Sequence, residues 1–381
     1  MRRALLALTG CRSDEIGSLD AEEWHALDAL AAGHRLRPHL YGRLVRGEIR
    51  VDVPRGIAAG WRDAHRSNAL LNLAYRRALR HATRALEAQG IAAVALKGSA
   101  LAWTVWPAPA ERSMRDIDIL VPEQQAAQAY DVLRAAGWEA PAVDAPILIA
   151  LLEKEPHLPP LVSSDGVMLE LHGHAWGASP LPGMAMPARD DGGFIKRSRR
   201  DDGLGMTIPQ ADDMLAHLVI HGALSHLFNA GPLVLADIDY LTAKSPIGWP
   251  SFWERAKAGG FAKAAALMIA LTDRWRQPGL LARARCPVAI DEAAMAQAER
   301  LLCQDPEARK DINAIAGLRM SGSAGRLSQR PLEAAAMREG TLSGAARLGR
   351  RGLSLAGSLI DREIRRDGLE TASLARWLGE A

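Results

Sequence analysis

Two aspartates separated by one residue, Asp116 and Asp118, are the side chains best suited to chemistry in this sequence. They open an apolar run that extends to Val121, and a run of this length is typical of a buried strand. Side chains at positions i and i+2 of a strand point to the same face, so the two carboxylates project together. Because like charges held this close repel each other, the pair predicts a site for a divalent cation.

An earlier apolar run, residues 91–96, ends in Lys97-Gly98-Ser99. Gly98 allows the backbone to approach a ligand closely, and Ser99 opens a predicted helix whose free N–H groups suit a phosphate. Lys97 adjoins this turn, where it is either a contact for a triphosphate or an ordinary surface lysine. A phosphate-binding turn followed by a metal-binding carboxylate pair predicts the transfer of a nucleotidyl or phosphoryl group.

A third carboxylate, Glu170, lies on a later predicted strand. Residues 158–163 and 167–172 flank Ser164-Asp165-Gly166, which is a hairpin-type turn signal. In the second arm Glu170 and His172 share a face, from which Glu170 can project toward the aspartates. The alternatives are that Glu170 is only the polar face of a hairpin and that His172 is a structural histidine rather than a contact for a phosphate or an acceptor.

The string LKGSAL…R…DIDILV resembles the DNA polymerase β nucleotidyltransferase superfamily, and within it a bacterial group of nucleotidyltransferases. The segment WHALDALAAGHR at residues 24–35 is similar to an N-terminal segment of that group. Glu170 before Leu171-His172 and the spaced His217, His221 and His226 ahead of Asp237 also match. The resemblance covers roughly residues 20–260.

The resemblance implies a Mg²⁺-dependent enzyme with an NTP as co-substrate. Asp116, Asp118 and Glu170 would hold two Mg²⁺ ions, because every candidate ligand is a hard oxygen. A hydroxyl of the acceptor would attack the α-phosphorus, with Glu170 as general base, and pyrophosphate would leave. The residues predicted to contact the NTP are Lys97, Gly98, Ser99, Arg112 and His172.

Two departures from the family pattern keep a second hypothesis open. The spacing from Ser99 to Asp116 is longer than in many relatives, and Glu170 stands where relatives often have Asp. The alternative is therefore a catalytically silent module of the same fold that binds a nucleotide or a partner. The acceptor, whether a small molecule, a peptide or a protein, is not indicated. The Arg-rich C-terminal stretch has no aromatic platform, so we interpret it as solvated surface rather than a nucleic-acid site.

The tripeptide Asp-Ile-Asp occurs a second time, at residues 237–239, within a predicted helix. Side chains at i and i+2 of a helix diverge by about 200°, so these carboxylates cannot share a cation. We predict that Asp237 lies well away from the cleft, bonded to a helix end, a His or an Arg, and that Asp239 faces elsewhere. His217 and His221 have a spacing that can bind metal but lack the adjacent Glu of a zincin. We interpret them as a buried, hydrogen-bonded pair.

The composition is that of a soluble globular protein. The chain has 381 residues, 48% of them hydrophobic and 24% charged, which is enough for a large core and for two lobes. A formal charge of +3 is too small to indicate a polyanionic partner. The three cysteines are scattered and form no C-x-x-C, so the sequence supports neither a disulfide framework nor a zinc knuckle. The chain has no apolar run long enough to span a membrane and no signal peptide, so we expect it in the cytoplasm.

The predicted fold class is α+β, with a small mixed nucleotidyltransferase sheet flanked by helices, N-terminal helices and a C-terminal all-helical region. The predicted divisions are an N-terminal helical region (1–89), a nucleotidyltransferase core (90–208), a helical domain (209–317) and a basic, partly irregular tail (318–381). Residues 175–206, rich in Gly, Pro, Asp and Arg, are predicted to be one long loop. Further helices are predicted over 55–89, 210–228, 232–243, 250–258, 261–276 and 353–366.

Overall fold

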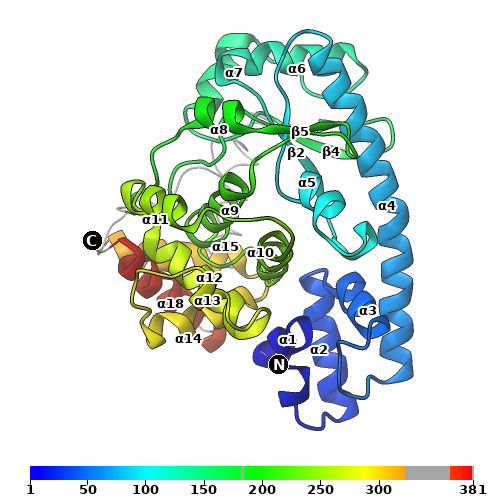
Figure 1. Ribbon diagram of the computed structural model, residues 1–381, viewed down its shortest axis with the longest axis vertical. Helices are drawn as coiled ribbons and strands as arrows, with labels where there is room; N and C mark the ends of the chain where they lie inside the picture. Colours follow the sequence, from blue (N-terminus) through cyan, green and yellow to red (C-terminus); the bar gives the residue numbers. More distant parts are fainter. Residues whose placement is uncertain (182–183, 322–360, 380–381) are drawn as a thin grey trace, which may run out of the picture.

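The computed structural model describes residues 1–181, 184–321 and 361–379, and it places one mixed sheet between groups of helices (Figure 1). The strands, in sheet order, are β3 (Leu161–Val162), β4 (Met168–His172), β2 (Asp116–Leu120), β1 (Val94–Ala95), β6 (Met206–Ile208) and β5 (Arg199–Asp201). β2 runs parallel to β4 and antiparallel to β1, and β1 runs parallel to β6. The predicted α+β fold class is therefore confirmed.

The two faces of the sheet differ because side chains alternate along each strand. Ile117 and Ile119 of β2 and Leu169 of β4 belong to the main hydrophobic core, on the face that contacts α4 (Arg55–Glu87) and α6 (Ala126–Ala135). On the other face Leu120 joins a small separate cluster of buried residues. Asp116, Asp118 and Glu170 share this second face, where the core is thin and polar groups can reach a cavity.

The N-terminal helices begin with α1 (Arg2–Thr9) and continue through α2 (Ala21–Gly33) and α3 (Arg37–Val45) to α4. Asp20 caps α2 by accepting a hydrogen bond from the N–H of Glu23, whose side chain bonds back to the N–H of Asp20. α4 has 33 residues and is about 50 Å long. In Figure 1 it runs from the N-terminal helices to α6 at the far end of the molecule, so it links these helices to the sheet.

The prediction of one long loop over residues 175–206 is wrong. This segment contains α8 (Asp191–Arg197) and β5, and its end enters β6, which pairs with β1. Gly205, with φ +74°, forms the turn of the β5–β6 hairpin. β5 is entirely charged, and β6 alternates apolar and polar residues over only three positions, which is too short a pattern to identify a strand in a sequence. Pairing with the rest of the sheet stabilises them instead.

The predicted hairpin is confirmed, since β3 and β4 pair in antiparallel register with Gly166 (φ +76°) between them. The remaining short elements are α5 (Lys97–Thr104), α7 (Ala145–Leu152), η1 (Ser13–Glu15), η2 (Pro109–Glu111) and η3 (Glu123–Gln125). The helix predicted over 55–89 corresponds to α4, which ends before Gly90 in a left-handed conformation (φ +69°).

The C-terminal part of the described chain is helical, as predicted. Its helices are α9 (Ala211–Val219), continued by the π-helical turn η4 (Ile220–Ser225), and α10 (Leu233–Lys244), α11 (Trp249–Ala258), α12 (Ala262–Trp275), α13 (Leu280–Arg283), α14 (Glu292–Leu302), α15 (Arg309–Ser321) and α18 (Arg362–Gly379). Most of the tail predicted at 318–381, including most of the helix predicted at 353–366, lies outside the described residues. Within the described ranges, no helix combines the length and apolar character needed to cross a membrane.

The two ends of the described chain lie together. Arg2 of α1 forms ion pairs with Glu363 and Asp367 of α18, each at 2.7 Å, and α1 also packs on α12 and α14. Adding a Cβ at Gly10 would place it 1.8 Å from the carbonyl oxygen of Trp275, so only glycine permits this close approach. The first helix of the chain therefore packs both on the N-terminal helices α2 and α3 and on the C-terminal helices.

Candidate functional site

A cavity of about 350 Å³ opens on the sheet face that carries Asp116, Asp118 and Glu170, and we call it the carboxylate cavity. Its wall comes from six separate segments of the chain, within residues 33–35, 97–98, 112–118, 170, 218–237 and 306–309. The charged and histidine residues that line it are His34, Arg35, Lys97, Arg112, Arg115, Asp116, Asp118, Glu170, His221, His226, Asp237 and Arg309. Gly98 also lines it, and a Cβ there would lie 2.9 Å from the side chain of Met114, so this turn admits only glycine without a shift.

Asp118, Glu170 and His172 form a compact group of possible metal ligands. Asp118 and Glu170 are direct partners in the parallel register of β2 and β4, and one ligand atom from each of the three residues lies within 4.8 Å of the others. The His172 Nε2 is 2.9 Å from the Asp118 Oδ1 and 3.5 Å from the Glu170 Oε2. Burial alone would lower the pKa of His172, but the hydrogen bonds to these two carboxylates raise it above its ordinary value. The His172 Nε2 is therefore placed to donate a hydrogen bond to Asp118.

Asp118 is held by two further side chains from the β1–α5 turn. The Lys97 Nζ donates to the Asp118 Oδ1 at 2.8 Å, and the Ser99 Oγ accepts a hydrogen bond from the Asp118 N–H at 2.8 Å. Burial would raise the pKa of Asp118, but Lys97 and His172 lower it well below the usual range. Lys97 has φ +46°, an uncommon backbone conformation for a residue with a side chain. The turn is thus shaped around Asp118.

Ser99 is not where the sequence analysis places it, because it is only 1% exposed and does not line the carboxylate cavity. β1 ends at Ala95, although the Leu96 N–H still donates to the carbonyl of Asp118. The N–H of Asp118 points toward α5, and the hydroxyl of Ser99 accepts its hydrogen bond. Ser99 therefore positions β2, whereas the prediction that it contacts the NTP remains a prediction.

Asp116 lines the cavity and has no hydrogen-bond partner among the described residues. Burial raises its pKa to about 6, and repulsion from Asp118 and then Glu170 adds to the rise. Glu170 behaves differently: burial would raise its pKa, but the hydrogen bond to His172 and the nearby His157 lower it. A half-buried carboxylate repelled by two others is a candidate ligand for a cation.

Arg112 and Asp237 are bonded across the same cavity. The Arg112 Nε and Nη2 donate to the two carboxylate oxygens of Asp237 at 2.9 and 2.8 Å, and the Arg112 Nη1 donates to the Ser113 carbonyl. The indole N–H of Trp106 also donates to Asp237, at 2.8 Å. Asp237 therefore has an Arg partner, as predicted, but the prediction that it lies well away from the cleft is wrong.

The error has a physical cause. The helical geometry correctly separates Asp237 from Asp239, which pairs with Arg276 and does not line the cavity. It does not determine where α10 packs. α10 lies with its Asp237 side against the segment that enters β2, so a structural ion pair forms part of the cavity wall.

The segment from Pro109 to Met114, which leads into β2, is fixed by polar side chains on one face of α4. The Asn68 Nδ2 donates to the Ala110 carbonyl at 2.7 Å, and the Asn72 Nδ2 donates to the carbonyls of Pro109 and Arg112. The Tyr75 hydroxyl donates to the Met114 carbonyl at 3.3 Å. These bonds satisfy backbone groups of an irregular segment and hold it in one conformation.

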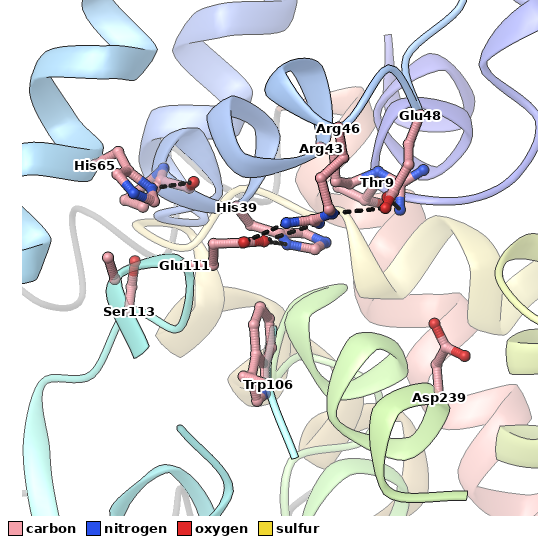
Figure 2. Close-up of polar contacts among 12 residues, drawn as sticks. Thr9, His39, Arg43, Arg46, Glu48, His65, Trp106, Glu111, Ser113 and Asp239 are labelled. Carbon is pink, nitrogen blue, oxygen red and sulfur yellow. Dashed lines mark hydrogen bonds and ion pairs between the residues drawn. The ribbon is translucent and has the colours of Figure 1, made fainter. Parts of the chain in front are cut away.

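Figure 2 shows the second anchor of this segment, in which Glu111 lies between His39 and Arg46. Arg46 donates to both oxygens of Glu111, one of them at 3.0 Å. The Arg276 Nη1 lies 3.2 Å from the His39 Nε2, so this nitrogen is the acceptor and the Nδ1–H faces Glu111 at 3.5 Å. Burial lowers the pKa of His39 to about 3, so the ring is neutral.

The histidines of α9 and η4 lie beside the cavity. The rings of His217 and His221 stack with centroids 5.9 Å apart, and those of His221 and His226 are 4.3 Å apart. Burial lowers the pKa of His217 to about 3 and that of His226 to about 4. His217 is buried as predicted, but His221 is only half-buried and lines the cavity. The two ring nitrogens of His217 have no hydrogen-bond partner among the described residues, so the prediction of a hydrogen-bonded pair is wrong for His217. Among the described residues, His217 and His221 belong to no group of three His, Cys, Asp or Glu side chains whose ligand atoms lie within 4.8 Å of one another.

Sequence reasoning missed four cavity residues: His34, Arg35, Arg115 and Arg309. The His-Arg pair that ends the segment at 24–35 could have indicated the first two. The Arg35 carbonyl accepts a hydrogen bond from the Ser113 hydroxyl at 2.9 Å, which brings the end of α2 to the segment before β2. Nothing in the sequence around Arg309 points to the cavity.

Comparison with known proteins agrees with this geometry. No curated protein matches the chain. A family described as an uncharacterised nucleotidyltransferase matches residues 20–277, a range that includes both aspartates, Glu170 and the end of α2. This range is more than half of the chain. The chain therefore belongs to this uncharacterised nucleotidyltransferase family.

Proposed function

We propose that the protein is a Mg²⁺-dependent nucleotidyltransferase that transfers a nucleoside monophosphate from an NTP to a hydroxyl group of an acceptor. The observation that supports this most directly is the gathering of Asp116, Asp118 and Glu170 on one face, in a single cavity. The raised pKa of Asp116 supports it further, because a cation between the three carboxylates would relieve their repulsion.

The donor set fits Mg²⁺. Asp116, Asp118 and Glu170 would hold it through hard carboxylate oxygens, and no cysteine lines the cavity in the described part of the chain. Bound Mg²⁺ would neutralise charge that develops on the transferred phosphate and would make the acceptor hydroxyl more acidic. His172 and Lys97 both donate to the Oδ1 of Asp118, so the Oδ2 is the oxygen left for a cation.

The residues of the chain have separate proposed roles. Lys97, His172 and Ser99 position the carboxylate and the backbone of Asp118. Glu170, whose pKa is lowered, is ionised at neutral pH and is the proposed acceptor of the proton from the attacking hydroxyl. Gly98 allows the backbone at the start of α5 to lie against a bound nucleotide.

One observation favours the second candidate, a catalytically silent binding module. Two cationic groups, Lys97 and His172, already donate to the same oxygen of Asp118. In a protein that no longer binds a metal cation, such contacts would neutralise the charge of Asp118 in its place. The two candidates differ in turnover and not in fold.

The deciding experiment is incubation of the protein with each NTP, Mg²⁺ and sets of hydroxyl-bearing acceptors, including the protein itself, with the products resolved by mass. We expect pyrophosphate release and an adduct of one nucleoside monophosphate, both absent without Mg²⁺ and in Asp118→Asn. NTP binding without pyrophosphate release in every combination would establish the silent module instead.

A further inference from the structure

The phosphates of the nucleotide need cationic partners, and most of the residues predicted for this role are occupied. Lys97 and His172 donate to Asp118, and all three guanidinium nitrogens of Arg112 donate to Asp237 or to Ser113. A cation that already has a partner would have to break its bond before it could bind a phosphate, which costs part of the binding free energy.

Three arginines of the carboxylate cavity are different. Arg35 at the end of α2, Arg115 next to Asp116 and Arg309 at the start of α15 all line the cavity. Their side chains have no carboxylate or other hydrogen-bond acceptor among the described residues. The Nε of Arg309 is buried without a partner. A buried guanidinium N–H without an acceptor is costly, so the binding of an anion to Arg309 would be favourable.

The charge balance of the cavity leads to the same conclusion. Among the described residues it is lined by four carboxylates and five Arg or Lys side chains. The pairs Lys97–Asp118 and Arg112–Asp237 cancel, which leaves Asp116 and Glu170 facing the three unpaired arginines. Burial lowers the pKa of Arg309, and repulsion from Arg115 lowers it further, so the two guanidinium groups lie close enough to interact.

We infer that Arg35, Arg115 and Arg309 bind the β- and γ-phosphates of the NTP, an inference that rests on the proposed nucleotidyl transfer. The planar guanidinium group matches phosphate oxygens in a two-bond geometry, and three of them suit a polyphosphate. Arg115 directly precedes Asp116, so phosphates bound by these arginines lie beside the carboxylates.

This inference makes the C-terminal helices part of the site. Arg309 lies beyond residue 277, where the family match ends. It is positioned by α15, which packs on α18, and α18 is in turn held by Arg2 of the first helix. Arg309, whose Nε is buried without a partner, is thus supplied by a segment outside the region that the family match covers.

The test uses inorganic pyrophosphate and AMP as separate probes, each titrated calorimetrically into the full-length protein in Mg²⁺. We expect Arg309→Ala and Arg115→Ala each to weaken pyrophosphate binding about tenfold or more, in line with the loss of a charged hydrogen bond, and to leave AMP affinity unchanged. Arg309→Lys should recover only part of the loss, because it keeps the charge but not the planar group. The matched control is Arg319→Ala, an exposed arginine of the same helix, which should bind both probes like the wild type.

Pyrophosphate binding that is unchanged in both Arg309→Ala and Arg115→Ala, or an equal loss for AMP, would overturn the inference. Because Arg115 is exposed, its variant should fold even if that of Arg309 does not. The proposed function can fail independently of this inference. If the wild-type protein binds pyrophosphate through these arginines but transfers no nucleotide, the phosphate site is retained and the assignment as an enzyme is wrong.

Discussion

Arg112 and Asp237 are 125 residues apart in the sequence and are joined by two hydrogen bonds, at 2.9 and 2.8 Å. Their side chains are 13% and 3% exposed, so both charges are largely removed from water. The pair connects the segment before β2 to α10, and hence the sheet to the C-terminal helices. It is a structural contact within the wall of the candidate site.

The first prediction concerns this pair. Arg112→Ala should lower the free energy of unfolding by about 3 to 5 kcal/mol, because it leaves the carboxylate of Asp237 buried without its partner. The double variant Arg112→Ala/Asp237→Ala should be less destabilised than Arg112→Ala alone. Urea unfolding measures both. If Arg112→Ala unfolds like the wild type and loses only NTP affinity, Arg112 is a phosphate contact after all.

The second prediction concerns the metal pair. Asp116→Asn and Asp118→Asn should each abolish Mg²⁺-dependent nucleotide transfer. In EDTA, Asp116→Asn should also raise the melting temperature at pH 8, since it removes a carboxylate repelled by two others.

The stability gained in Asp116→Asn depends on pH because the pKa of Asp116 is raised in the folded protein. The folded-state pKa of Asp116, about 6, lies above the ordinary value of 3.8, so the ionised group destabilises the fold above pH 6. Below about pH 4 the group is protonated in both states, and the gain should vanish. A gain of equal size at pH 8 and at pH 4 would contradict the assignment of this pKa.

The third prediction concerns Glu170. If it accepts the proton of the acceptor hydroxyl, Glu170→Gln should lower kcat by about 10²-fold or more and leave NTP affinity nearly unchanged. Single-turnover kinetics combined with equilibrium NTP titration separate the two effects. Equal losses of binding and turnover would place Glu170 on the triphosphate, and an unchanged kcat would move the base role to Asp116.

The fourth prediction concerns acid sensitivity. His39 and His217 are 0% and 1% exposed, and burial lowers the pKa of each to about 3. Between this value and the ordinary 6.5 the unfolded chain binds protons that the folded protein does not, so stability should fall as the pH drops below 6.5. Each histidine contributes up to about 1.4 kcal/mol per pH unit.

Replacement of one histidine tests this account. His217→Met should reduce the pH dependence of urea unfolding between pH 6.5 and 4.5, because the unfolded state then gains one proton fewer. His25→Gln, at an exposed position of α2, is the control and should leave the slope unchanged. A slope that His217→Met does not alter would mean that His217 is protonated in the folded state.

The fifth prediction concerns the support of the segment before β2. Asn72 is 1% exposed and donates to the carbonyls of Pro109 and Arg112 at 2.6 and 3.2 Å. Asn72→Ala should cost about 1 to 3 kcal/mol of unfolding free energy and should lower transferase activity by loosening this segment. Leu73→Ala, at the adjacent and 62% exposed position, should change stability by less than about 0.5 kcal/mol. Equal effects of the two substitutions would show that the segment does not depend on Asn72.

The sequence predicts those parts of the site whose structure is determined by a local pattern of residues. Alternation along β2 and β4 was enough to place Asp116, Asp118 and Glu170 on one face, since each strand is a regular element. Packing between distant segments decides the rest. Asp237, Arg35 and Arg309 reach the cavity because of the way in which α10, α2 and α15 pack against the rest of the protein. Hydrophobic periodicity predicts that a helix forms, but it does not predict where that helix packs. β5 and β6 were missed for a related reason, because strands of three residues are defined by their neighbours.

The length of α4 has a mechanical consequence for substrate entry. One continuous helix of 33 residues contacts α3, the segment before β2 and α6, so the N-terminal helices and the sheet pack on the same helix (Figure 1). A hinge between these two parts would have to break that helix or its polar contacts to Pro109 and Ala110. We therefore expect the parts of the cavity wall supplied by Arg35 and by Asp116 to keep a fixed relative position when a substrate enters.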